Sequence, residues 1–117
     1  MAWQRYQRAY FIARTHLSRH YLDVLAFEWD ERKNLKNRIK HGVWLEEARR
    51  VFENPRALLM DDPDHSEQED RFLLLGMSAS RRVLVVVHCY REKKGMLRLI
   101  SARKSTKKER RIYEKGI

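Results

Sequence analysis

The clearest hydrophobic pattern lies in the last third of the chain. Residues 83–87 are an unbroken run of apolar, mostly β-branched side chains, which is typical of a strand covered on both faces. Residues 96–102 have the length of a second strand, and the short Gly-containing turn between the two runs predicts a β-hairpin. Thr106 and Glu109 then form a capping box at the start of a helix that Gly116 ends. We expect this hairpin and its helix to be central to the fold.

Three further strands are predicted upstream, at 24–29, 57–60 and 71–77. The loops that join the last four strands are too short for a crossover connection, so these strands should form an antiparallel meander. Helices fill the gap between the first two strands. The order therefore predicts an α+β fold: a mostly antiparallel sheet with a helical hairpin on one face and a C-terminal helix.

Two consecutive helices are predicted between the first and second strands. Asp30 caps the first helix and Gly42 ends it. Leu35 and Ile39, four residues apart, form its expected buried stripe. The second helix ends before Pro55, and its apolar residues have helical spacing: Trp44, Leu45, Ala48, Val51 and Phe52. The short connection between the two predicts a helical hairpin.

We predict that the first 22 residues are a separate extension and that residues 23–117 form one domain. In the extension, aromatic residues are interleaved with arginines in a loosely helical pattern. Such a segment could stack on bases or lie on a membrane surface. The simpler interpretation is an extension that packs against the domain or is poorly ordered. A mis-assigned start codon is a third alternative.

Composition adds a strong charge bias. The chain of 117 residues has 26 Lys and Arg against 16 Asp and Glu, a net charge of +10. Such a charge favours a polyanionic partner: nucleic acid first, an acidic protein second and an anionic membrane third. A merely soluble, well-charged surface is the alternative. Hydrophobic residues make up 43%, enough for one packed core at this length.

The single cysteine and the absence of long apolar windows indicate the compartment. Cys89 stands alone and lies in a strand, so we expect a core residue and neither a disulfide nor a cysteine-based zinc cluster. No window has the apolar length of a membrane-spanning helix, and no secretory signal is evident. The expected location is the cytoplasm, without membrane association.

One segment, residues 61–70, is acidic. It holds six acids and no Lys or Arg: Asp61, Asp62, Asp64, Glu67, Glu69 and Asp70. Clustered oxygens suit a divalent cation, but this spacing matches no EF-hand. We expect the loop to pair with the basic helices or with a basic partner, and we predict no metal and no cofactor.

The remaining polar residues suit metal-free RNA cleavage. A base takes the proton of a ribose 2′-hydroxyl, cations stabilise the phosphorane, and an acid protonates the leaving 5′-oxygen. His41, beside Lys40, is a candidate acid or base; a purely structural charge at the end of its helix is equally compatible with the pattern. Arg98 and Arg103 project from a predicted strand and suit bidentate binding of phosphate.

The other histidines are weaker candidates. His88 lies among apolar strand residues and is expected in the core. His65 lies in the acidic loop, where a role in the active surface and a structural role in the turn are both open. His16 and His20 have the i, i+4 spacing of metal ligands, but without a third ligand nearby we interpret them as surface residues.

Seven short motifs follow one another along the chain: FEWD at 27–30, KHGV at 40–43, EEA at 46–48, DHSE at 64–67, RF at 71–72, ISAR at 100–103 and ERR-x-Y at 109–113. Their order and spacing resemble those of the BrnT toxins. The resemblance covers residues 24–113. It implies the toxin half of a bacterial type II toxin–antitoxin pair, with a RelE-like fold and an endoribonuclease activity that inhibits translation.

The resemblance also implies partners and site residues. The partner is a cognate, BrnA-like antitoxin with a ribbon-helix-helix part, and operator DNA is bound only through the complex. Lys40, His41, Arg71 and Arg103 match the motifs, and His65 matches without a defined role. The expected catalytic residues are His41, Arg71 and Arg103, together with Arg98, which is added from its strand position and not from the resemblance. The expected RNA-binding residues are Lys40, His65, Lys104, Lys107 and Lys108.

Two departures from the family pattern leave open how the local structure is built. Trp44 stands where the family commonly has a small polar residue that caps the second helix, which predicts a frayed or repacked helix start. Gln68 stands where a Gly is common in the acidic loop. The alternative to a ribonuclease is a non-catalytic nucleic-acid-binding module of the same fold, and a degraded toxin is a third hypothesis.

Overall fold

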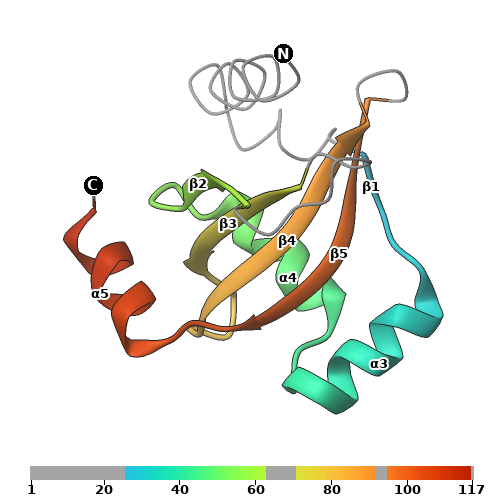
Figure 1. Ribbon diagram of the computed structural model, residues 1–117, viewed down its shortest axis with the longest axis horizontal. Coiled ribbons are helices and arrows are strands. Elements are labelled where there is room, and N and C mark those ends of the chain that lie inside the picture. The colour runs from blue at the N-terminus through green and yellow to red at the C-terminus, as the bar shows by residue number, and fades with distance from the viewer. Residues whose placement is uncertain (1–25, 63–70, 92–94, 117) are drawn as a thin grey trace.

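The computed structural model describes residues 26–62, 71–91 and 95–116. The predicted extension, His65 and most of the acidic loop lie outside these residues. Five strands form one sheet in the order β1-β5-β4-β3-β2 (Figure 1). The strands are β1 (Ala26–Glu28), β2 (Leu58–Asp61), β3 (Phe72–Met77), β4 (Val83–Arg91) and β5 (Met96–Lys104).

The predicted antiparallel meander is confirmed. Each neighbouring pair in β2-β3-β4-β5 is antiparallel. The first strand differs, because β1 pairs in parallel with β5, with Ala26 opposite Met96 and Glu28 opposite Arg98. This short pairing covers only the beginning of β5. A helix lies along the rest of that strand edge.

The helices are α3 (Glu31–His41), α4 (Leu45–Arg49) and α5 (Lys107–Lys115), and a 3₁₀ turn, η1 (Arg50–Glu53), continues α4. The predicted caps are confirmed. The Asp30 carboxylate accepts from two backbone N–H groups, and Thr106 and Glu109 form the capping box of α5. Gly42 and Gly116 end their helices with φ of 73° and 67°, the left-handed conformation that glycine adopts without a Cβ clash.

The two faces of the sheet are covered differently. On one face α4 and η1 bury Leu45, Ala48, Val51 and Phe52, as their spacing predicts. Trp44, the fifth residue of that predicted set, is instead 43% exposed. His88 is fully buried there against the rings of Phe52 and Phe72, and Cys89 is buried as well, so both core predictions are confirmed. On the other face, Ile112 and Tyr113 of α5 pack on a smaller cluster with Leu75, Val83 and Val85.

The prediction for the buried side of α3 is wrong. Leu35 and Ile39 are 53% and 77% exposed, whereas Asn34 and Asn37 are 1% and 6% exposed. The reason is that α3 lies beside the edge of β5, where backbone groups need partners. The Asn37 side chain donates to the carbonyls of Val43 (2.8 Å) and Ala102 (2.9 Å) and accepts from Ala102 N–H (3.1 Å). An apolar side chain cannot make these bonds.

Asn34 explains how Trp44 is tolerated at the start of α4. Trp44 occupies the N-cap position and makes no side-chain capping bond. Instead, Asn34 Oδ1 accepts from Leu45 N–H at 2.7 Å, and Asn34 Nδ2 donates to Glu46 at 2.7 Å. The helix start is therefore capped by α3, and the ring of Trp44 turns outward beneath the Arg38 guanidinium, 5.8 Å from the ring centroid.

Candidate nucleic-acid interface

A bulge in β5 shapes the first of two basic depressions. Val87 pairs with Ser101 and His88 with Leu99, so Ile100 has no partner on β4. Such bulges bend a strand and redirect its side chains. Ile100 and Ser101 lie against α3 and line a depression of about 340 Å³, here called the helix pocket, together with Lys33, Lys36, Asn37, Lys40 and His41.

The helix pocket gathers cations around one imidazole. Lys33, Lys36 and Lys40 recur at helical spacing and so lie along one flank of α3. His41 ends the helix and is half-buried; among the described residues it is the one histidine that reaches solvent, because His88 is buried. Lys40 and His41 were predicted from the sequence as active-surface residues. The structure adds Lys33 and Lys36, which helical periodicity could have placed on the same flank as Lys40.

The second depression lies where β4 begins and β5 ends. It measures about 310 Å³, is here called the turn pocket, and is lined by Arg81, Arg82, Val83, Lys104, Ser105, Thr106, Lys107 and Arg110. Lys104 and Lys107 were predicted from the sequence. Arg81 and Arg110 were missed, because only the pairing of the strands brings the β3–β4 turn beside α5. The start of α5 adds a helix N-terminus, which favours anions.

Arg82 lines the turn pocket but is already paired. Its guanidinium bonds both carboxylate oxygens of Glu47, with Nε 2.9 Å from Oε2, and Nη2 also donates to Gly42 O. Ser78 and Ser80 donate to the same carboxylate. The bond from Arg82, aided by the two serines, lowers the pKa of Glu47 to about 2. This network joins the β3–β4 turn to α4, so Arg82 has a structural role.

Arg103 is also held by a carboxylate. Its terminal nitrogens bond Glu109 in a bidentate pair at 2.8 and 2.9 Å, and Glu109 completes the capping box by accepting from Thr106 N–H. The Arg103 bond is the main cause that lowers the pKa of Glu109 to about 2. The predicted phosphate ligand is therefore engaged within the protein, and a phosphate would have to displace Glu109 to bind both terminal nitrogens.

Three other predicted residues lie outside both pockets. Arg98 is near the start of β5, opposite Cys89, with Nη1 3.9 Å from Glu28. Arg71 precedes β3, and its carbonyl accepts from Asp62 N–H. β4 lies between β3 and β5 in the sheet. The backbones at Arg71 and Arg98 are therefore two strand spacings apart, each of roughly 5 Å. Lys108 is exposed on α5 and lines neither pocket.

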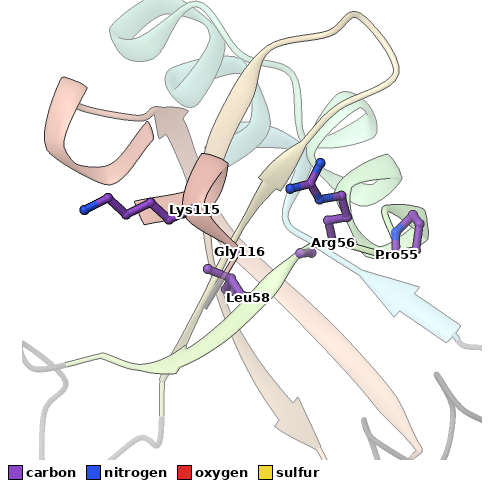
Figure 2. Close-up of a pocket in the computed structure, with 6 residues that line it drawn as sticks. Pro55, Arg56, Leu58, Lys115 and Gly116 are labelled. Atoms are coloured by element: carbon purple, nitrogen blue, oxygen red, sulfur yellow. The ribbon is translucent and has the colours of Figure 1, made fainter. Parts of the chain in front are cut away.

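A third depression, of about 300 Å³, lies between the start of β2 and the end of α5. Figure 2 shows that the side chains of Arg56 and Lys115 point in different directions at its rim. Arg56 instead lies over the ring of Tyr113, 6.0 Å from its centroid. The cations do not converge, and we do not include this depression in the interface.

The described residues contain neither a candidate metal cluster nor a helix that could span a membrane. That part of the chain contains no group of three or more His, Cys, Asp or Glu side chains that could hold a metal ion. Within the same residues, no helix has the length and apolar character needed to cross a membrane.

Together, the fold and the two pockets define a small α+β protein with a cationic surface along one strand of its sheet. A family model described as "Ribonuclease toxin, BrnT, of type II toxin-antitoxin system" matches residues 29–109. The chain belongs to this family, as the sequence motifs predicted. Membership implies an antitoxin partner and an RNA target.

A solved structure has the same fold. The 1.1 Å crystal structure of the Brucella abortus ribonuclease toxin BrnT matches with a TM-score of 0.54 and 20% sequence identity, over 72% of this chain and 100% of that chain. At this identity the likeness shows the fold alone, and it agrees with the predicted fold class. Among curated proteins no match is found.

Proposed function

We propose that this chain is an endoribonuclease toxin that cleaves RNA without a metal, inhibits translation and is neutralised by a cognate antitoxin. Family membership supports the ribonuclease class. The observation that carries the proposal is the helix pocket, in which Lys33, Lys36 and Lys40 lie around His41 and none of the described lining residues is acidic. A pocket of this charge suits a phosphodiester, and an imidazole suits proton transfer near neutral pH.

The proposed reaction is attack of a ribose 2′-oxygen on the adjacent phosphorus. The P–O5′ bond breaks, which gives a 2′,3′-cyclic phosphate and a free 5′-hydroxyl. One proton leaves the 2′-hydroxyl and one reaches the 5′-oxygen, and His41 carries out one of these transfers. The lysine ammonium groups stabilise the negative charge that grows on the phosphorane oxygens.

The turn pocket extends the proposed RNA path. Ser101 and Lys104 are three residues apart on β5, about 10 Å along the strand. Lys104, Lys107, Arg81 and Arg110 would bind flanking phosphates, with Lys108 and His65 as further proposed contacts. Arg71, Arg98 and Arg103 remain proposed contributors to catalysis, and for Arg103 the role requires release from Glu109.

The direct test is RNA cleavage by the purified chain in EDTA. Wild type should cleave, and His41→Ala should lose about 10²–10⁴-fold in rate. Lys115→Ala, which removes a cation outside both pockets, is the matched control and should keep full activity. Loss of wild-type cleavage in EDTA would contradict metal independence, and an active His41→Ala would remove His41 from the chemistry.

Intact RNA both with and without EDTA would leave two options, a ribosome-dependent enzyme and the binding-module alternative. The two are separated by adding translating ribosomes, because a ribosome-dependent enzyme would then cleave messenger RNA. A binding module would only retain RNA, with affinity that falls steeply as salt rises.

The proposed partners follow from the toxin class. The antitoxin is a BrnA-like protein with a ribbon-helix-helix part, and the proposed site of action is the cytoplasm. Added antitoxin should stop cleavage. Operator DNA should shift in a gel with the complex and not with the toxin alone.

A further inference from the structure

The outward face of α3 is apolar in a way that the fold does not require. Leu35 and Ile39 are one helical turn apart and point away from the buried Asn34 and Asn37. Trp44 is 43% exposed, and its ring lies under the guanidinium of Arg38 from the same helix. We call Leu35, Ile39 and Trp44 the α3 ridge; they are the exposed large hydrophobic residues of the described chain. In Figure 1, the outer side of α3 faces no other labelled element.

Positive charge borders this ridge. On α3 it is flanked by Arg32, Lys33, Lys36, Arg38 and Lys40. Two acids also lie nearby: Glu31 accepts from Trp29 Nε1 at 2.8 Å, and Glu46 accepts from Asn34 Nδ2 at 2.7 Å. The cations of α3 outnumber these two acids. An occupant that complements the ridge therefore has apolar side chains on one face and acids on either side of them.

Charge also argues against the two occupants that this chain itself could supply. A second copy docked ridge to ridge would place like charges opposite each other, which is destabilising. The first 22 residues contain four arginines and no Asp or Glu. A partner with an acidic amphipathic helix is the complementary choice, since such helices bind through apolar residues at i and i+4.

We propose that the antitoxin binds the α3 ridge through an acidic amphipathic helix. This inference rests on the proposed function, which supplies the antitoxin as partner. Lys33, Lys36 and Lys40 lie on the flank of the same helix that forms the helix pocket. The acidic side chains of an antitoxin bound at the α3 ridge lie beside the helix pocket and repel RNA phosphates. Antitoxin and RNA therefore compete, although the antitoxin need not enter the pocket.

The test measures binding of the full chain to its purified cognate antitoxin by calorimetry, without RNA. The double variant Leu35→Ala/Ile39→Ala should bind at least tenfold more weakly than wild type. Its melting temperature and RNA cleavage should be unchanged, because both side chains are exposed and lie outside the helix pocket. Arg32→Glu, on the same face, should also weaken binding, and more strongly at low salt than at high salt.

The matched control is Arg111→Ala/Lys115→Ala, which removes exposed cations from α5 and should leave affinity unchanged. A double variant that binds antitoxin within twofold of wild type would overturn the proposal. So would loss of binding in the α5 control alone, or a toxin dimer that the ridge variant dissociates while antitoxin still binds. Failure of the ribonuclease proposal is a separate result, since it appears as intact RNA and leaves the binding measurement readable.

Discussion

Two helices that flank the same sheet, α3 and α5, bury opposite kinds of side chain. α5 follows the usual amphipathic rule: Tyr113 and Ile112 pack on the sheet, and its charges other than Glu109 are exposed. α3 reverses it, with amides inside and Leu35 and Ile39 outside. The difference arises because α5 meets a sheet face, which is apolar, whereas α3 meets a strand edge, which presents backbone N–H and C=O groups. What a helix buries thus depends on which part of the sheet it meets.

The largest expected effect is on the buried amide of α3. Asn37→Leu should lower the free energy of unfolding by about 3 kcal/mol or more, because it leaves three buried backbone groups without partners. Urea unfolding measures this. The mirror variant Leu35→Asn, on the outward face, should cost less than about 1 kcal/mol through helix propensity. Equal costs for the two variants would contradict the inverted packing.

The sheet face covered by α4 and η1 should respond to mildly acidic pH. Burial lowers the pKa of His88 from 6.5 to about 4. Between these two pH values the unfolded chain binds a proton at His88 and the folded chain does not. Stability from neutral His88 is present above pH 6.5 and is lost as pH falls towards 4, by roughly 3 kcal/mol. His88→Phe should flatten this part of the stability curve in urea titrations. An unchanged pH dependence would show that another group titrates there.

The α5 side is expected to respond at lower pH. Glu109→Gln should lower the free energy of unfolding by about 1–2 kcal/mol at pH 7, since it weakens a charge-assisted bidentate pair. Because the folded pKa of Glu109 is depressed to about 2, the wild-type advantage should persist above pH 4.5 and disappear as pH falls to 2.

The same variant tests Arg103. If Glu109 restrains a phosphate ligand, Glu109→Gln should bind RNA more tightly while it loses stability, and Arg103→Ala should lose toxicity and RNA cleavage. If Arg103 is only structural, both variants should lose similar stability, and RNA affinity in filter binding should not change between Glu109→Gln and wild type.

The smallest expected effect is on the α3 ridge in the free protein. Ile39→Ala should change the free energy of unfolding by less than about 0.5 kcal/mol, because an exposed Ile loses little burial and Ala is the better helix former. Ile112→Ala on α5, which packs against the core, should cost more. A cost for Ile39→Ala as large as that for Ile112→Ala would indicate that the α3 ridge is covered in the free protein.

Local sequence was sufficient for much of this protein. The strands, the antiparallel meander and the caps at Asp30, Gly42, Thr106 and Gly116 were predicted, because each depends on residues close together in the chain. The core positions of His88 and Cys89 followed from the apolar run around them. Lys40 with His41, and Lys104 with Lys107, were predicted as parts of a basic surface because their spacing is local.

Only the tertiary structure decided which side of α3 is buried, since amides are favoured inside only when a strand edge lies opposite. It also decided that Arg103 meets Glu109 and that Arg81 joins Lys104, because these contacts depend on how β5 enters α5 and pairs with β4. Periodicity records which side chains share a helix face. It does not record whether that face meets apolar side chains, backbone groups or a partner, and that environment sets the free energy of burial.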